Sequence, residues 1–161
     1  TGHGAFSLVR VAGELQFIYL DTRWHSDVQQ ALSEDRLSMP AGEGIGAVVF
    51  ADILASTLPE LQYLIVFTDS TAVVAALQTG NSPSPQLNFI VRWLFERRPR
   101  LQVLALHQPG KRNDGADRLS RAGSAAVLAE ATAIGARICH VGSAAITDAL
   151  AREAMRMPQS I

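Results

Sequence analysis

The chain has 161 residues, of which 48% are hydrophobic and 18% charged, and its formal net charge is −1. This composition is that of one globular domain, or one domain with an appendage, and a charge so close to zero points to no class of partner. The single cysteine, Cys139, excludes a disulfide framework and a thiolate metal site. No apolar run reaches the roughly 18 residues that span a bilayer, and no signal peptide is visible. We therefore expect an intracellular protein, in the cytoplasm or the nucleus, without a membrane partner.

In chain order, the sequence first predicts a β-hairpin over residues 4–19, because apolar residues alternate on both sides of a turn at Ala12-Gly13-Glu14. Residues 23–41 are polar and irregular, which predicts a loop with a short third strand or an edge segment. A helix is predicted to begin at Ser38, because Pro40 stands near its first position and apolar residues follow at helical spacing.

The next predicted element is an apolar strand over residues 63–68, which we expect to be buried on both faces. Ser70 or Thr71 should cap a helix that ends at Gly80. A further helix is predicted over 86–97 and a strand over 101–106. The order of hairpin, helix, strand, two helices, strand and helix predicts an α/β domain with a mixed sheet flanked by helices.

Residues 107–121 predict a tight basic turn followed by a helix that Asn113 can cap. Asp117 falls near the start of that helix, where the helix dipole favours a carboxylate. Asp69 ends the apolar strand before it, so two acids at the ends of elements that can lie side by side suggest a divalent-metal site. The window 97–121 holds seven Lys and Arg against two Asp, about +5, which is typical of a face that contacts phosphates.

Two stretches together carry a family resemblance. They are Val66-Phe-Thr-Asp-Ser-Thr-Ala-Val-Val-Ala-Ala-Leu-Gln-Thr-Gly80 and His107-Gln-Pro-Gly-Lys-Arg-Asn-Asp-Gly-Ala-Asp-Arg-Leu-Ser-Arg121. In this order they resemble the ribonuclease H domain of reverse-transcribing retroelements, in particular the DIRS-like group with a tyrosine recombinase. The resemblance covers 63–121, is looser over 1–62 and is absent over 122–161. It implies a ribonuclease H-like domain over 1–121, with 122–161 as an Ala-rich helical extension.

Members of that family hold two Mg²⁺ ions, for which Mn²⁺ can substitute, with four acids. Asp69 matches the acid that ends the fourth strand, and Asp117 matches the acid on the last helix. Glu43, near the start of the helix predicted from Ser38, is the acid placed to match the one on the first helix. From the residues alone each acid also has a structural interpretation, with Asp69 and Asp117 at helix starts and Glu43 on the surface.

The remaining acid of the family has no clear counterpart. In relatives it lies shortly before a Gly-x-Gly, here Gly2-His-Gly4, which puts it upstream of Thr1 and implies that the first strand is truncated. Within the chain, Asp21 is the alternative. The chain also begins without an initiator methionine, so we expect it to be a piece of a longer protein.

The resemblance implies metal-dependent endonucleolytic hydrolysis of the RNA strand of RNA–DNA hybrids. The domain would work within a retrotransposon polyprotein, beside an upstream reverse transcriptase domain. The alternative is a catalytically inactive domain of the same fold that serves as a scaffold or binds nucleic acid. The side chains expected to contact nucleic acid are Ser70, Lys111, Arg112, Asn113, Arg118 and Arg121.

Overall fold

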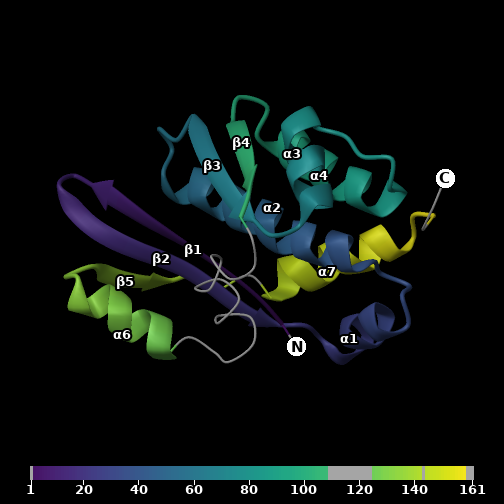
Figure 1. Ribbon diagram of the computed structural model, residues 1–161, viewed down its shortest axis with the longest axis horizontal. Coiled ribbons are helices and arrows are strands. Elements are labelled where there is room, and N and C mark those ends of the chain that lie inside the picture. The colour runs from purple at the N-terminus through teal and green to yellow at the C-terminus, as the bar shows by residue number, and fades with distance from the viewer. Residues whose placement is uncertain (1, 109–124, 143, 159–161) are drawn as a thin grey trace.

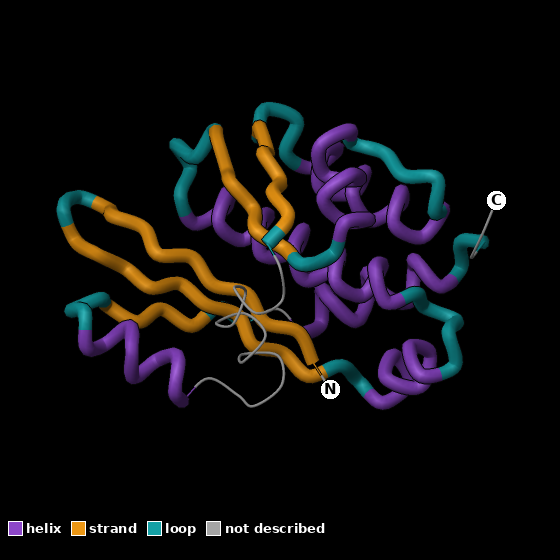
Figure 2. Tube along the Cα trace, viewed as in Figure 1, coloured by secondary structure: helices purple, strands orange, loops and turns teal. Residues whose placement is uncertain are grey.

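The computed structural model describes residues 2–108, 125–142 and 144–158. Figure 1 shows how its helices and strands are arranged, and Figure 2 shows that most helices gather on one side of the strands while the helix next to β5 stands apart. The elements are β1 (Gly2–Val11), β2 (Glu14–Arg23), α1 (Ser26–Ser33), α2 (Met39–Thr57), β3 (Tyr63–Thr68), α3 (Thr71–Thr79), α4 (Pro85–Arg97), β4 (Gln102–His107), α6 (Ala125–Ala133), β5 (Arg137–His140) and α7 (Ala144–Met155).

The described strands form two sheets. In the first, β2 pairs with β1 in the antiparallel direction and with β5 in the parallel direction; in the second, β3 and β4 are parallel. The predicted α/β class, with a mixed sheet flanked by helices, is confirmed. Within the described residues, β1 and β3 each pair with a single strand, so each leaves one edge without a strand beside it.

The predicted hairpin is confirmed and is longer than its sequence pattern indicates. Val11 pairs with Glu14, so the loop has only two residues, Ala12 and Gly13. Both have positive φ, 51° and 83°, which is the backbone that matches the twist of a two-residue hairpin. Glycine adopts this conformation freely at the second position, while Ala12 adopts it at a cost.

The prediction for residues 23–41 is wrong, because this stretch contains helix α1 and, beyond Arg23 at the end of β2, no strand. Val28 and Ala31 are fully buried in the main core. The side chain of the N-cap residue His25 makes no capping bond, and its backbone N–H instead donates to Asp148 Oδ1 of α7 at 3.1 Å. Contacts with a distant element therefore hold the start of this helix, and the local sequence carries no signal for them.

Helix α2 is the core helix of the molecule. Its predicted start is confirmed, since Ser38 accepts a hydrogen bond from Ala41 N at 3.2 Å. It packs against α3, α4, α7 and β1. Among the described helices it alone is long and apolar enough to cross a bilayer, but 61% of that stretch is buried in the protein. Its contacts on several sides account for its apolar composition.

Helices α2 and α4 run in the same direction and contact each other at both ends. At their starts, a Cβ placed on Gly44 would lie 2.8 Å from Leu87 Cδ1, so any larger residue there would require the Leu87 side chain to shift. At their ends, the buried carboxylate of Asp52 accepts hydrogen bonds from Arg97 and Arg98. α2 is thus fastened to α4 by close packing at one end and by ion pairs at the other.

The β3–β4 pair has one buried face and one exposed face. Leu64 and Val66 pack against the core, whereas three alternate residues of β3 are more than half exposed and two of β4 also remain exposed. The prediction that β3 is buried on both faces is therefore wrong. The exposed side chains are Tyr63, Ile65, Phe67, Leu104 and Leu106.

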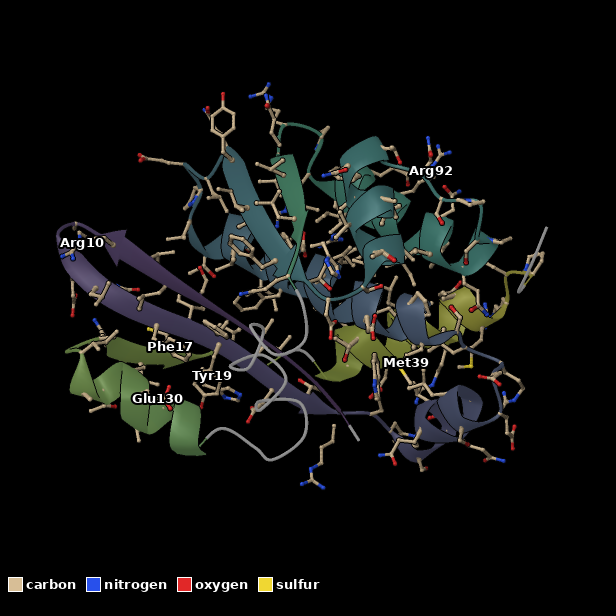
Figure 3. The ribbon with its side chains drawn as sticks, in the orientation of Figure 1. Arg10, Phe17, Tyr19, Met39, Arg92 and Glu130 are labelled. Carbon is tan, nitrogen blue, oxygen red and sulfur yellow. The ribbon has the colours of Figure 1, made fainter. Side chains whose placement is uncertain are left out.

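The C-terminal stretch contains the two expected helices and the short strand β5 between them. Leu150, Ala151 and Ala154 of α7 lie in the same core cluster as α2 and α4. On the other side of the molecule, α6 and β5 cover Phe17 and Tyr19 of β2, as Figure 3 shows. Residues 122–161 thus contribute to the packing of the hairpin and of the main core.

Candidate functional site

Asp69 lies where the two parallel strands end. It follows the last residue of β3 directly, and Ser70 caps α3 by accepting a hydrogen bond from Val73 N at 3.3 Å. Thr68 is in register with His107, the last residue of β4, and Gln108 N donates to Thr68 O at 2.9 Å. The chain therefore leaves β3 and β4 at the same edge of the sheet, and Asp69 stands at that edge.

Glu43 reaches this edge from the start of α2. It lies between Gly42 and Gly44, whose missing side chains allow two neighbours to approach the helix. A Cβ on Gly42 would lie 3.1 Å from Leu32 Cδ2, and one on Gly44 would meet Leu87. The glycines, which weaken a helix by about 1 kcal/mol each, thus have a packing role. They let the first turns of α2 lie close to the elements on both sides.

The electrostatics tie Glu43 to Asp69. Loss of hydration raises the pKa of the Glu43 carboxyl group, a hydrogen bond with the Ser70 side chain lowers this pKa, and the charge of Asp69 raises it again. In the described part of the chain, neither acid has a Lys, Arg or His partner. Two carboxylates from distant segments therefore share one edge of the sheet, and no described cation compensates their charge.

The raised pKa predicts that Glu43→Gln makes the folded protein more stable at neutral pH. Because the folded-state pKa lies above the ordinary value of 4.5, stability linked to Glu43 is fully present below that value and is lost as pH rises through the folded-state pKa. Glutamine stays neutral and avoids this loss. Urea unfolding should give a higher midpoint for the variant at neutral pH and equal midpoints below about pH 4.

Glu60→Gln is the matched control, since Glu60 is an exposed acid in the loop before β3. It should leave the midpoint unchanged at both pH values. If Glu43→Gln left the midpoint at neutral pH unchanged as well, neither loss of hydration nor the charge of Asp69 would be raising the pKa of Glu43 in the folded protein.

Most other predicted site residues lie outside the described ranges. Asp117 is one of them, so the structure does not test whether it joins Glu43 and Asp69. Among the described residues, no three His, Cys, Asp or Glu side chains are grouped so as to hold a metal ion. Asp21, the alternative for the first acid, forms a hydrogen bond with His140 of β5, with 3.0 Å between Asp21 Oδ1 and His140 Nε2. The predicted nucleic-acid contacts that lie outside the described ranges are Lys111, Arg112, Asn113, Arg118 and Arg121.

The described part of the basic window lies away from Asp69. Arg97 and Arg98 are bound to Asp52 at the end of α4, which leads into the start of β4. Asp69 stands at the opposite end of the strand pair, about 17 Å away for five residues of extended chain. These two arginines therefore hold the fold together. Asp52 was not among the predicted site residues, although an acid surrounded by apolar residues in a helix is a signal that it has a buried partner.

The described site can supply two carboxylates, Glu43 and Asp69, which are hard oxygen ligands. Two neighbouring carboxylates that have no Lys, Arg or His partner among the described residues suit Mg²⁺ or Mn²⁺, and a bound cation would relieve their mutual repulsion. Comparison of the chain with protein-family models, with curated proteins and with solved structures gave no match. The function is therefore inferred from the residues and their placement.

Proposed function

We propose that the chain is a metal-dependent nuclease domain of the ribonuclease H type, which hydrolyses the RNA strand of RNA–DNA hybrids beside a retroelement reverse transcriptase. The observation that carries this proposal is that the start of α2 lies against the start of α3: Val73 Cγ2 of α3 is 3.8 Å from the Cβ position of Gly44, and the charge of Asp69 acts on the neighbouring Glu43 carboxyl group. The two acids are far apart in sequence and lie on a helix and at a strand end. These are the positions that the family resemblance assigns to two of the four metal ligands.

The donor set fits a hard divalent cation, and Glu43 and Asp69 would hold it through their carboxylate oxygens. The chemistry that a bound pair of such cations would supply is activation of the attacking water and stabilisation of the leaving oxygen of a phosphodiester. Ser70 would orient the site, because its oxygen accepts from Val73 N while its hydroxyl can donate to Glu43. Groups that orient a ligating carboxylate in this way typically affect metal affinity.

Asp117 is proposed as a third ligand. The support is the path of the chain, since β4 ends beside Thr68, at the same edge as Asp69. Asp117 lies nine residues beyond Gln108, within reach of that edge. The basic residues proposed to contact nucleic acid, from Lys111 to Arg121, belong to the same stretch of sequence that follows β4.

The two-sheet arrangement supports the proposal of a truncated first strand. Among the described strands, β1 and β3 each have one edge without a partner, and Phe50 and Leu54 of α2 belong to a cluster that includes residues of both sheets. A strand added between β1 and β3 would join the sheets into one mixed sheet above α2. Such a strand would also carry the fourth acid, and Asp21 would then keep its pairing with His140.

The proposal is tested by incubating the domain, extended at its start by the strand proposed to carry the fourth acid, with an end-labelled RNA–DNA hybrid. We expect Mg²⁺-dependent shortening of the RNA strand, none with a chelator, and no cleavage of duplex DNA. The alternative, a domain that binds hybrids without cleaving them, is favoured by the fact that only two acids meet among the described residues. Binding of the hybrid without cleavage would support that alternative, and absence of both would reject the two functions together.

A further inference from the structure

Gln86 is a fully buried polar residue in the first turn of α4. A buried amide must satisfy its hydrogen-bonding groups, and this one does so outside its own helix. Its Oε1 accepts from Ser38 N at 3.0 Å, and its Nε2 donates to Arg36 O at 2.7 Å. Both contacts are to the backbone of the segment that connects α1 with α2.

These contacts hold the start of α2. Ser38 is its N-cap residue, and its side chain accepts from Ala41 N at 3.2 Å. Glu43 lies five residues after Ser38, in the second turn of α2. Gln86 holds the N-cap residue of this same helix. A displacement of the N-cap would therefore displace Glu43 as well.

A second contact from the same turn of α4 sets the rotation of α2. Leu87, the neighbour of Gln86, fills the space that the missing side chain of Gly44 leaves open, and Val73 Cγ2 of α3 lies 3.8 Å from the same Cβ position. Glu43 is adjacent to Gly44 along the helix. Helices α2, α3 and α4 thus meet at Gly44. Of these, α2 carries Glu43, α3 is capped by Ser70 and α4 carries Gln86 in its first turn.

We propose that Gln86 is a positioning residue, which holds Glu43 against Asp69 and Ser70 through the N-cap of α2. It acts through the backbone of Ser38 and touches neither acid in the described contacts. The inference rests on the proposed function, in which Glu43 and Asp69 are metal ligands. It adds a residue that the four-acid pattern does not contain.

The test compares Gln86→Met with Leu94→Ala in the full chain. Methionine has nearly the shape of glutamine and keeps the core filled, but it can neither accept from Ser38 N nor donate to Arg36 O. Leu94 is fully buried in the same helix, two turns further on, and serves as a control for a general loss of packing. Gln86→Met should weaken Mn²⁺ binding by roughly 10-fold, as groups behind a ligand commonly do. Leu94→Ala should change it less than about 2-fold.

Hydrogen exchange at the amides of Ala41 and Gly42 provides a readout that does not depend on metal. Both amides donate to Ser38, to its Oγ and its carbonyl oxygen respectively. Their exchange should be roughly 10-fold faster in Gln86→Met than in Leu94→Ala once global stability is accounted for. Equal exchange in the two variants would overturn the inference. Failure of the unchanged chain to bind Mn²⁺ would overturn the proposed function instead, and the exchange result would still decide the role of Gln86.

Discussion

Replacing Asp69 with asparagine should lower the rate of Mg²⁺-dependent cleavage of the RNA strand by at least about 100-fold. Asparagine keeps the shape of the side chain but removes the charge, and charged oxygen ligands are what a catalytic Mg²⁺ pair requires. Asp69 is exposed and follows the last residue of β3, so the substitution should leave the fold intact. The measurement is the initial cleavage rate, with an unfolding midpoint on the same sample.

Asp21→Asn is the matched control, since Asp21 is the alternative candidate for a metal ligand. Because Asp21 is bound to His140 on β5, we expect this variant to cleave within about 2-fold of the unchanged chain. Cleavage that persists in Asp69→Asn would reject the assignment of the site. A loss of cleavage in Asp21→Asn with no change in stability would indicate that the metal site lies at the hairpin, where Asp21 is located.

Replacing Asp52 with alanine should destabilise the fold by about 2–3 kcal/mol. Removal of one partner from a buried ion pair typically costs about 3–5 kcal/mol, and Asp52 is 6% exposed. Its carboxylate accepts from Arg98 Nε at 2.8 Å and from Arg97 Nη2 at 3.2 Å. The expected cost lies below that range because the side chain of Arg97 is 51% exposed and that of Arg98 is 30% exposed. Water can therefore solvate both guanidinium groups once the Asp52 carboxylate is removed.

Denaturant unfolding of Asp52→Ala measures this effect, and Arg97→Ala provides the comparison. Arg97→Ala should cost less than about 1 kcal/mol, because Arg98 still neutralises Asp52 and Arg97 is itself half exposed. A cost of Asp52→Ala no larger than that of Arg97→Ala would mean that the carboxylate contributes little to the packing of α2 on α4.

Where the sequence predicted the fold correctly, the signal was local. Ala12-Gly13 between two runs of alternating apolar residues predicts the hairpin. Ser38, Ser70 and Gly80 predict helix ends, and the structure confirms them as capping residues. α1 lacked such a signal, because a backbone bond to Asp148 replaces the side-chain cap. The division into two sheets and the exposed face of β3 depend on which strands pair, and no short stretch of sequence encodes that.

The candidate site was predictable in part for the same reason. Asp69 stands directly after an apolar strand, and Glu43 lies at the spacing that the family resemblance requires. The reason for the glycines around Glu43 was not visible, because Leu32 and Leu87 come close only in the folded chain. Gln86 was missed because a glutamine at the start of a helix is usually a surface residue.

The attachment of α2 to α4 at both ends has a consequence for how the protein opens. Gly44 against Leu87 prevents sliding at one end, and Asp52 against two arginines anchors the other. The stretch of α2 from Gly44 to Asp52 should therefore open only together with α4, because both of its ends contact that helix. Glu43 lies next to Gly44, so a subglobal opening that spares both α4 and the end of β3 would leave Glu43 beside Asp69.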